Sequence, residues 1–201
     1  LRSIRDDSWI LGGYAFYDYR WTDGSNNFSQ TTLGIEALSV VWEARANAYI
    51  PNEHPRDFGV RRPIAPGVAL QPFEVAYYGF DSEVGALLKS WGCNDEVELR
   101  AFVGGFHFDT DERLPNISGP RARVELRLYD LAILGDQGRI TIGANYKWDQ
   151  VRDDQVHLLL RVRIPLGRKS QGVRLSPLRR RMTDRVVRDV DIVINQGEKQ
   201  V

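Results

Sequence analysis

The sequence has almost no cysteine and no long apolar run, and both shortages narrow the class of protein. Its one cysteine, Cys93, excludes an internal disulfide framework, which fits a secreted β protein and a cytosolic protein alike. No stretch of 18 or more apolar residues is present, so the sequence excludes a membrane-spanning helix. Helical repeats and low-complexity tracts are absent as well.

Net charge is also missing. The chain has 27 Lys and Arg residues against 27 Asp and Glu residues, so no overall field attracts nucleic acid or an acidic partner. The basic run from Arg179 to Arg181 has three charges in a neutral chain, which is a weak nucleic-acid signal. We therefore expect no nucleic-acid partner, and a length of 201 residues fits one domain.

What the sequence does have is strict alternation of charged and apolar residues in three segments, 121–129, 139–148 and 155–166. A period of two predicts extended strands with unlike faces, and about ten residues is the length a tilted strand needs to cross a bilayer. In a soluble sandwich the charged face would meet water. In a membrane barrel it would line the lumen, and the apolar face would meet lipid.

The rest of the chain predicts further strands at 9–19, 31–37, 40–50, around 82–89, and from 97 onwards. A β-bulge at Gly104–Gly105 is expected, because Phe106 and Phe108 change parity there. Residues 1–8 are expected to be a polar lead-in, and 51–72, with five prolines, a long loop. After a linker at 170–177, the sequence predicts a short basic helix at 178–187, an extended piece at 190–194 and a polar tail at 195–201.

Three N-terminal segments resemble the transmembrane domain of the inverse autotransporters, the intimin and invasin family: Trp9–Tyr19, Leu33–Glu36 and Ala46–Pro51. The segment Arg180–Ile194 resembles the part that follows the barrel in that family. The resemblance implies an antiparallel outer-membrane barrel of roughly twelve strands. It also implies a partly helical segment that threads the lumen and leads an adhesive passenger to the cell surface.

We therefore expect an all-β fold, an antiparallel transmembrane β-barrel of about 10–12 strands, with its first strands upstream of Leu1. Residues 1–167 would form the barrel, and residues 168–201 the linker, the lumenal helix and the exit segment. Arginine suits the lumen, because its fixed fork of donors bridges carboxylates and the carbonyls of a threaded segment. The candidate lumen-lining residues are Glu43, Arg45, Glu98, Arg100, Arg121, Arg123, Glu125, Arg127, Arg161 and Arg163.

The lipid face would carry the apolar partners of these residues, with aromatic side chains near strand ends as interfacial girdles. The expected lipid-facing residues include Val124, Leu126, Ile140, Ile142, Leu158, Leu160 and Val162. The expected girdle residues are Trp9, Tyr17, Tyr19, Trp42, Tyr129, Tyr146 and Trp148.

The predicted function is that of a bacterial outer-membrane barrel that anchors, and exports, an adhesin-like C-terminal passenger. The alternatives are a passive outer-membrane pore and a soluble β-sandwich binding module. No nucleophile, base and acid are brought together, so we expect no enzyme and no cofactor. His107, Asp109, Asp111 and Glu112 are interpreted as a charged loop rather than a metal site.

The expected partners are outer-membrane lipid and, by the family resemblance, the barrel-assembly machinery and periplasmic chaperones. A host or surface receptor would be bound through a passenger outside these 201 residues.

Overall fold

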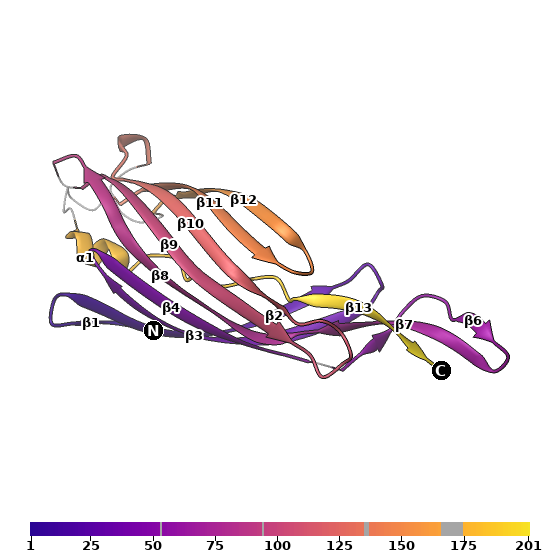
Figure 1. Cartoon of the computed structure of the whole chain (residues 1–201). Coiled ribbons are helices and arrows are strands. Elements are labelled where there is room, and N and C mark those ends of the chain that lie inside the picture. The colour runs from indigo at the N-terminus through magenta and orange to yellow at the C-terminus, as the bar shows by residue number, and fades with distance from the viewer. Residues whose placement is uncertain (53, 94, 135–136, 166–174) are drawn as a thin grey trace.

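The computed structural model describes residues 1–52, 54–93, 95–134, 137–165 and 175–201. Its main feature is one antiparallel sheet of nine strands (Figure 1). In sheet order, these strands are β1 (Arg2–Arg5), β2 (Trp9–Trp21), β3 (Asn27–Ser39), β4 (Trp42–Pro51), β8 (Tyr78–Trp91), β9 (Val97–Asp109), β10 (Ile117–Tyr129), β11 (Arg139–Asp149) and β12 (Asp153–Arg163). The prediction of an all-β, antiparallel fold is confirmed.

The main sheet curls, so that it has a concave and a convex face. The guanidinium of Arg127 on β10 lies 3.4 Å from the carboxylate of Glu43 on β4, although β8 and β9 separate these strands in the sheet. Side chains of a flat sheet would not meet across two intervening strands. Over the described residues the sheet is not closed: β1 and β12 are its edges, and its nine strands are fewer than the ten to twelve expected.

Sequence alternation decides which side chains lie on each face. Along β10, Arg121, Arg123, Glu125 and Arg127 are buried on the concave side, and Val124 between them is exposed on the convex side. On β12 the apolar residues are still more exposed: 71% for Leu160. Such a continuous apolar surface marks contact with a membrane or another protein.

A second, four-stranded sheet extends beyond one end of the main sheet (Figure 1). In it, β13 (Ile194–Gln200) pairs with β7 (Val68–Ala76), which also pairs with β5 (Arg56–Asp57) and β6 (Arg62–Ala65). The prediction of a long loop at 51–72 is therefore wrong. Pro63 lies in β6, which is an edge strand. Pro72 lies in β7, between the residues that pair with β5 and those that pair with β6. Neither proline therefore removes a hydrogen bond from a ladder.

Three other local predictions are also wrong. Residues 2–5 form β1 and pair with β2, and the supposed polar tail forms β13. No bulge lies at Gly104–Gly105: β9 pairs with β10 without interruption, and the register shift is in β8, between Leu87 and Lys89. Phe106 and Phe108 share the concave face with Arg100, so their parity never changes.

The helical content is small. A 3-10 turn covers Ala132–Leu134, and α1 covers Pro177–Arg181, shorter than the predicted helix at 178–187. The backbone N–H of Arg179 donates to the side chain of Ser176, the N-cap of α1. Leu166 and residues 170–174 of the expected linker lie outside the described residues, as do residues 135 and 136.

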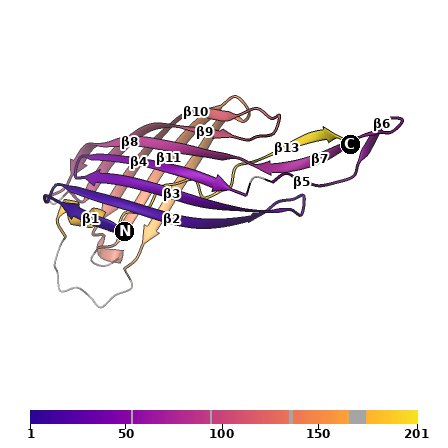
Figure 2. The same cartoon turned by 90° about the horizontal axis from the view of Figure 1, so that it is seen from below.

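The C-terminal segment, residues 175–201, connects the two ends of the molecule. Figures 1 and 2 place α1 at one end of the main sheet and β13 at the other, beside β7. Between them the chain has few backbone partners of its own, since only the short helix and β13 are regular. Side chains of the concave face supply hydrogen-bond partners for several of its backbone groups.

Candidate functional site: the charged concave face and the C-terminal segment

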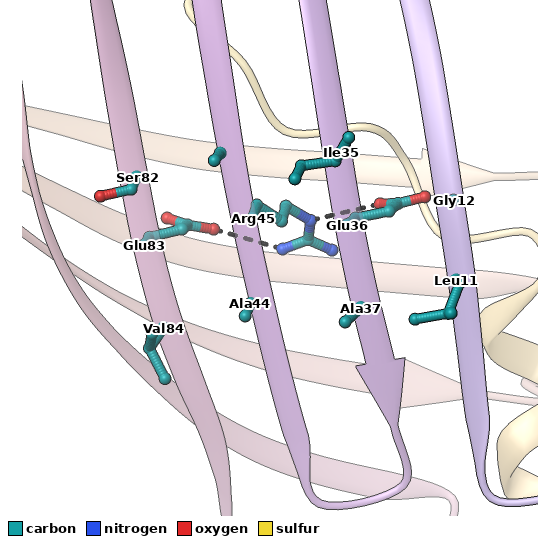
Figure 3. Close-up of a pocket in the computed structure, with 11 residues that line it drawn as sticks. Leu11, Gly12, Ile35, Glu36, Ala37, Ala44, Arg45, Ser82, Glu83 and Val84 are labelled. Atoms are coloured by element: carbon teal, nitrogen blue, oxygen red, sulfur yellow. Dashed lines mark hydrogen bonds and ion pairs between the residues drawn. The ribbon is translucent and has the colours of Figure 1, made fainter.

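The concave face carries rows of ion pairs between neighbouring strands. Arg45 on β4 lies directly opposite Glu36 on β3 and Glu83 on β8. Its guanidinium is 3.5 Å from Glu36 and 3.2 Å from Glu83. Figure 3 marks both contacts with dashed lines. Glu83 also pairs with Arg123 of β10. Opposite charges at facing register positions thus connect β3, β4 and β8, and the ion pair of Glu83 with Arg123 reaches across β9 to β10.

A second group is centred on Glu43. Its carboxylate lies 3.2 Å from Arg100, 3.4 Å from Arg127 and 2.7 Å from Arg181. Arg100 is completely buried, pairs with Glu98 at 2.8 Å, and donates at 2.6 Å to the carbonyl of residue 40 in the β3–β4 turn. Buried charges are tolerated only when they are paired and hydrogen-bonded. Arg100 meets both conditions, and Glu43 is paired with these three arginines and accepts a hydrogen bond from Arg100.

Asp184 brings the C-terminal segment into this ion-pair network. Its carboxylate lies 3.3 Å from Arg127 and 3.1 Å from Arg181, and it also pairs with Arg139 of β11. Arg2 of β1 donates to the carbonyls of residues 182 and 184, at 2.8 and 2.6 Å. Strands β1, β10 and β11 therefore hold the same short stretch of the segment.

Further along, concave side chains hold the backbone and the charges of the segment. Asn47 donates to the carbonyl of Val187 at 3.2 Å, and the hydroxyl of Tyr49 accepts from the N–H of Asp189 at 2.7 Å. Asp189 pairs with Lys147 at 2.8 Å. Arg188 forms two bonds to Asp18, at 2.6 and 2.8 Å.

The segment finally passes into the second sheet. The N–H of Tyr77 donates to the carbonyl of Val193 at 2.9 Å, directly before β13 begins to pair with β7. Ile192 is buried against Phe28 and Ala76. The segment thus contacts the concave face from α1 at one end to β13 at the other.

The structure places all ten candidate lumen residues on the concave side. Eight are buried, and on β12 Arg161 and Arg163 are half-buried. Arg163 donates to the carbonyl of Thr183 at 3.3 Å. The buried residues are Glu43, Arg45, Glu98, Arg100, Arg121, Arg123, Glu125 and Arg127.

Sequence reasoning missed several members of this network, and it misplaced one aromatic residue. Glu36, Glu83 and Asp184 were not among the candidates, although the first two continue the charged parity of their strands. Tyr129, expected in a girdle, is buried, and its hydroxyl donates to Glu98 at 3.3 Å. The other expected girdle residues are exposed, among them Trp9 and Trp42.

Among the described residues, no three or more His, Cys, Asp and Glu side chains are grouped to hold a metal ion. His107 instead lies beside the ring of Phe80, with the ring centroids 5.8 Å apart. None of the helices described is both long and apolar enough to span a membrane.

The structure is a curled antiparallel sheet with an exposed apolar outside, a charged inside, and a segment of its own chain along that inside. These features are those of the class of outer-membrane β-barrel domains. The comparison with family models makes the assignment more specific: the model of the inverse autotransporter β-domain matches residues 1–139. This chain belongs to the inverse autotransporter β-domain family, as its sequence resemblance predicted. No curated protein and no solved structure matches the chain.

Proposed function

We propose that this chain anchors its C-terminal segment in the bacterial outer membrane and leads a passenger of adhesin type to the cell surface. Membership of the inverse autotransporter β-domain family implies an outer-membrane domain for anchoring and secretion, which is not an enzymatic role. The passenger, its adhesive role and its export are the parts that we propose for this chain.

The observation that carries the proposal is the course of residues 175–201. This segment crosses from α1 to β13 in contact with the concave face, and the contacts are made by its backbone as well as by its side chains. Side-chain donors that bind backbone carbonyls accept many sequences, so they suit a face along which a chain must pass. The convex apolar face supplies the matching contact with lipid.

In this proposal residues 1–167 are the membrane domain and residues 168–201 are the threaded part. The ten candidate residues, from Glu43 to Arg163, would line the lumen and hold the threaded part in place. Outer-membrane lipid would cover Leu158, Leu160 and the other convex residues. We further propose, from the family, that periplasmic chaperones and the barrel-assembly machinery insert the domain, and that a surface receptor binds the passenger.

The two alternatives make different predictions. A soluble β-sandwich would bury its apolar faces, whereas here the apolar face is the exposed one. A passive pore would leave its lumen open, whereas here the concave face is occupied by the C-terminal segment. Deleting residues 178–201 would leave the conductance of a passive pore unchanged, and would raise the conductance of a barrel filled by this segment.

The direct test places an epitope tag after Val201 and expresses the chain, with a secretion signal, in a bacterium that has an outer membrane. We expect the tag to bind antibody on intact cells, and the protein to migrate faster on a gel unboiled than boiled. A tag that is detected only after the outer membrane is broken would overturn the export proposal. A soluble protein without the migration shift would overturn the membrane assignment.

A further inference from the structure

The second sheet contains an edge that binds a strand. Residues 194–200 pair with residues 76–70 of β7 in unbroken antiparallel register. Ala69 and Val201 extend this ladder by exchanging both backbone hydrogen bonds, at 3.0 and 2.9 Å. Main-chain pairing of this kind gives affinity for an extended peptide, and side-chain pockets then give specificity.

One face of the ladder has a slot that fits only glycine. Gly197 lies opposite Phe73, and a Cβ atom at position 197 would lie 2.7 Å from Cζ of that ring and 3.0 Å from Cδ2 of Leu114. The ring is 4% exposed and packs in the cluster that contains Val75 and Phe108. Because its neighbours hold the ring in place, a larger side chain at 197 must displace the strand.

The other face has a polar pocket centred on Glu74. This carboxylate is buried and accepts hydrogen bonds from Thr22 at 2.6 Å and from Asn26 at 3.0 Å. The side-chain amide of Gln196 donates to its second oxygen at 3.2 Å. The β2–β3 turn therefore fixes the orientation of the acceptor, and the bound strand supplies one amide donor.

Parts of the chain outside the C-terminal segment build both faces of β7. Phe73 and Val75 pack with Phe106, Phe108 and Ile117 of β9 and β10 on one side. Ala76 packs against Phe28 of β3 on the other. The site is thus assembled by the main sheet, and β13 is its occupant.

We propose that the edge of β7 is a strand-binding site for an extended peptide with a glycine opposite Phe73 and an amide side chain just before that glycine. In this chain the occupant is its own segment 194–200. The site holds the segment beyond the main sheet, after the segment has passed the concave face. This role rests on the proposed export, whereas the binding of a strand to β7 does not.

The test uses the full-length chain with Gly197→Pro, which fills the slot and removes one backbone donor to β7. The matched control is Gln200→Pro, because residue 200 lies next to the hydrogen-bonded pair of 201 with 69 and so gives no backbone bond to β7. A fluorescent peptide with the sequence of residues 193–201 is titrated onto each protein. Unboiled gel migration checks that each variant is folded.

We expect the peptide to bind the Gly197→Pro chain about tenfold or more tightly than the wild-type and Gln200→Pro chains, whose sites are occupied. A peptide carrying Gly197→Val should bind the emptied site about tenfold more weakly than the unchanged peptide. Equal binding of both peptides, or no binding to a folded Gly197→Pro chain, would overturn the proposal.

A second measurement covers the case in which Gly197→Pro fails to fold. In a Cys93→Ser background, Leu70→Cys with Gln200→Cys places two thiols at facing positions, where a disulfide forms readily. Pro72→Cys with Gln200→Cys is out of register and should crosslink far less. Equal crosslinking of the two pairs would overturn the proposed strand-binding site. Peptide binding without surface exposure of a tag after Val201 would overturn the export alone, and exposure without peptide binding would overturn the site alone.

Discussion

Asp184 is the residue whose removal tests most directly how the C-terminal segment is held. It is buried, and it neutralises Arg127, Arg139 and Arg181 from the middle of the ion-pair network. In Asp184→Asn the shape of the side chain is kept and the charge is lost. Arg127 keeps Glu43 and Glu125, whereas Arg139 has no other carboxylate at ion-pairing distance among the described residues.

The free-energy cost of Asp184→Asn follows from the environment of Arg139. Removing one partner of a buried ion pair costs about 3–5 kcal/mol, because the remaining charge stays desolvated. The ring of Tyr129, 5.6 Å from this guanidinium, offsets a small part of the cost, so we take the lower limit of about 3 kcal/mol. A change of this size raises the ratio of released to docked segment about 100-fold.

Asp189→Asn is the matched control. It removes the same charge from the same segment, but the side chain of Asp189 is 25% exposed and its partner, Lys147, is also partly exposed. A pair of this kind contributes less than about 1 kcal/mol, which corresponds to a change of no more than about fivefold.

Amide hydrogen exchange of residues 177–184, measured by mass spectrometry, reports the opening of this stretch. Its protected amides include those of Arg180, Met182 and Asp184. We expect exchange about 100-fold faster in Asp184→Asn and only a few-fold faster in Asp189→Asn. Equal acceleration in the two variants, or none in Asp184→Asn, would show that the buried ion pairs do not hold the segment.

Three further predictions concern the sheet itself. Leu160→Asp puts a charge on the exposed convex face at a cost of up to about 2 kcal/mol, and should abolish the fast-migrating unboiled band in the membrane fraction, whereas Val151→Asp in a turn should not. Arg100→Lys should lower the free energy of unfolding in urea by about 2 kcal/mol, because lysine cannot serve both carboxylates and the turn carbonyl; an unchanged midpoint would refute this. Gly85→Ala should lower the melting temperature, at a cost of about 1–3 kcal/mol, because its Cβ would strike the opposing aromatic ring. Gly13→Ala is the control, since the nearest atom to its Cβ lies 3.8 Å away, and equal melting of the two variants would contradict the argument.

Alternation alone was enough to predict most strands and both faces of the sheet. Side chains on a strand point to opposite sides in turn, so Arg123 and Val124 had to lie on different faces in any sheet. The same rule holds at Phe106 and Phe108, but the expectation that apolar residues lie on the convex face fails there. These rings face the concave side with Arg100, because the C-terminal segment gives them an apolar contact there, through Val193.

Proline and polarity were less reliable guides. Pro63 and Pro72 predicted a loop, but each lies where its strand needs no hydrogen-bond donor, and that depends on which strands are neighbours. Residues 195–201 are polar, and on that ground the sequence predicts a tail. They form a strand because β7 offers them an unpaired edge, which the local sequence does not reveal.

By itself, the sequence determined the secondary structure class, the two faces of the strands and the family, because these depend on local periodicity and on short segments of characteristic residues. Only the tertiary structure decided which charges meet. Asp184 is separated by 57 residues from Arg127 and by 45 from Arg139, and nothing near it in sequence indicates either partner. The curl of the sheet and the course of the C-terminal segment bring these charges together, because a buried carboxylate is stable only where the fold surrounds it with donors.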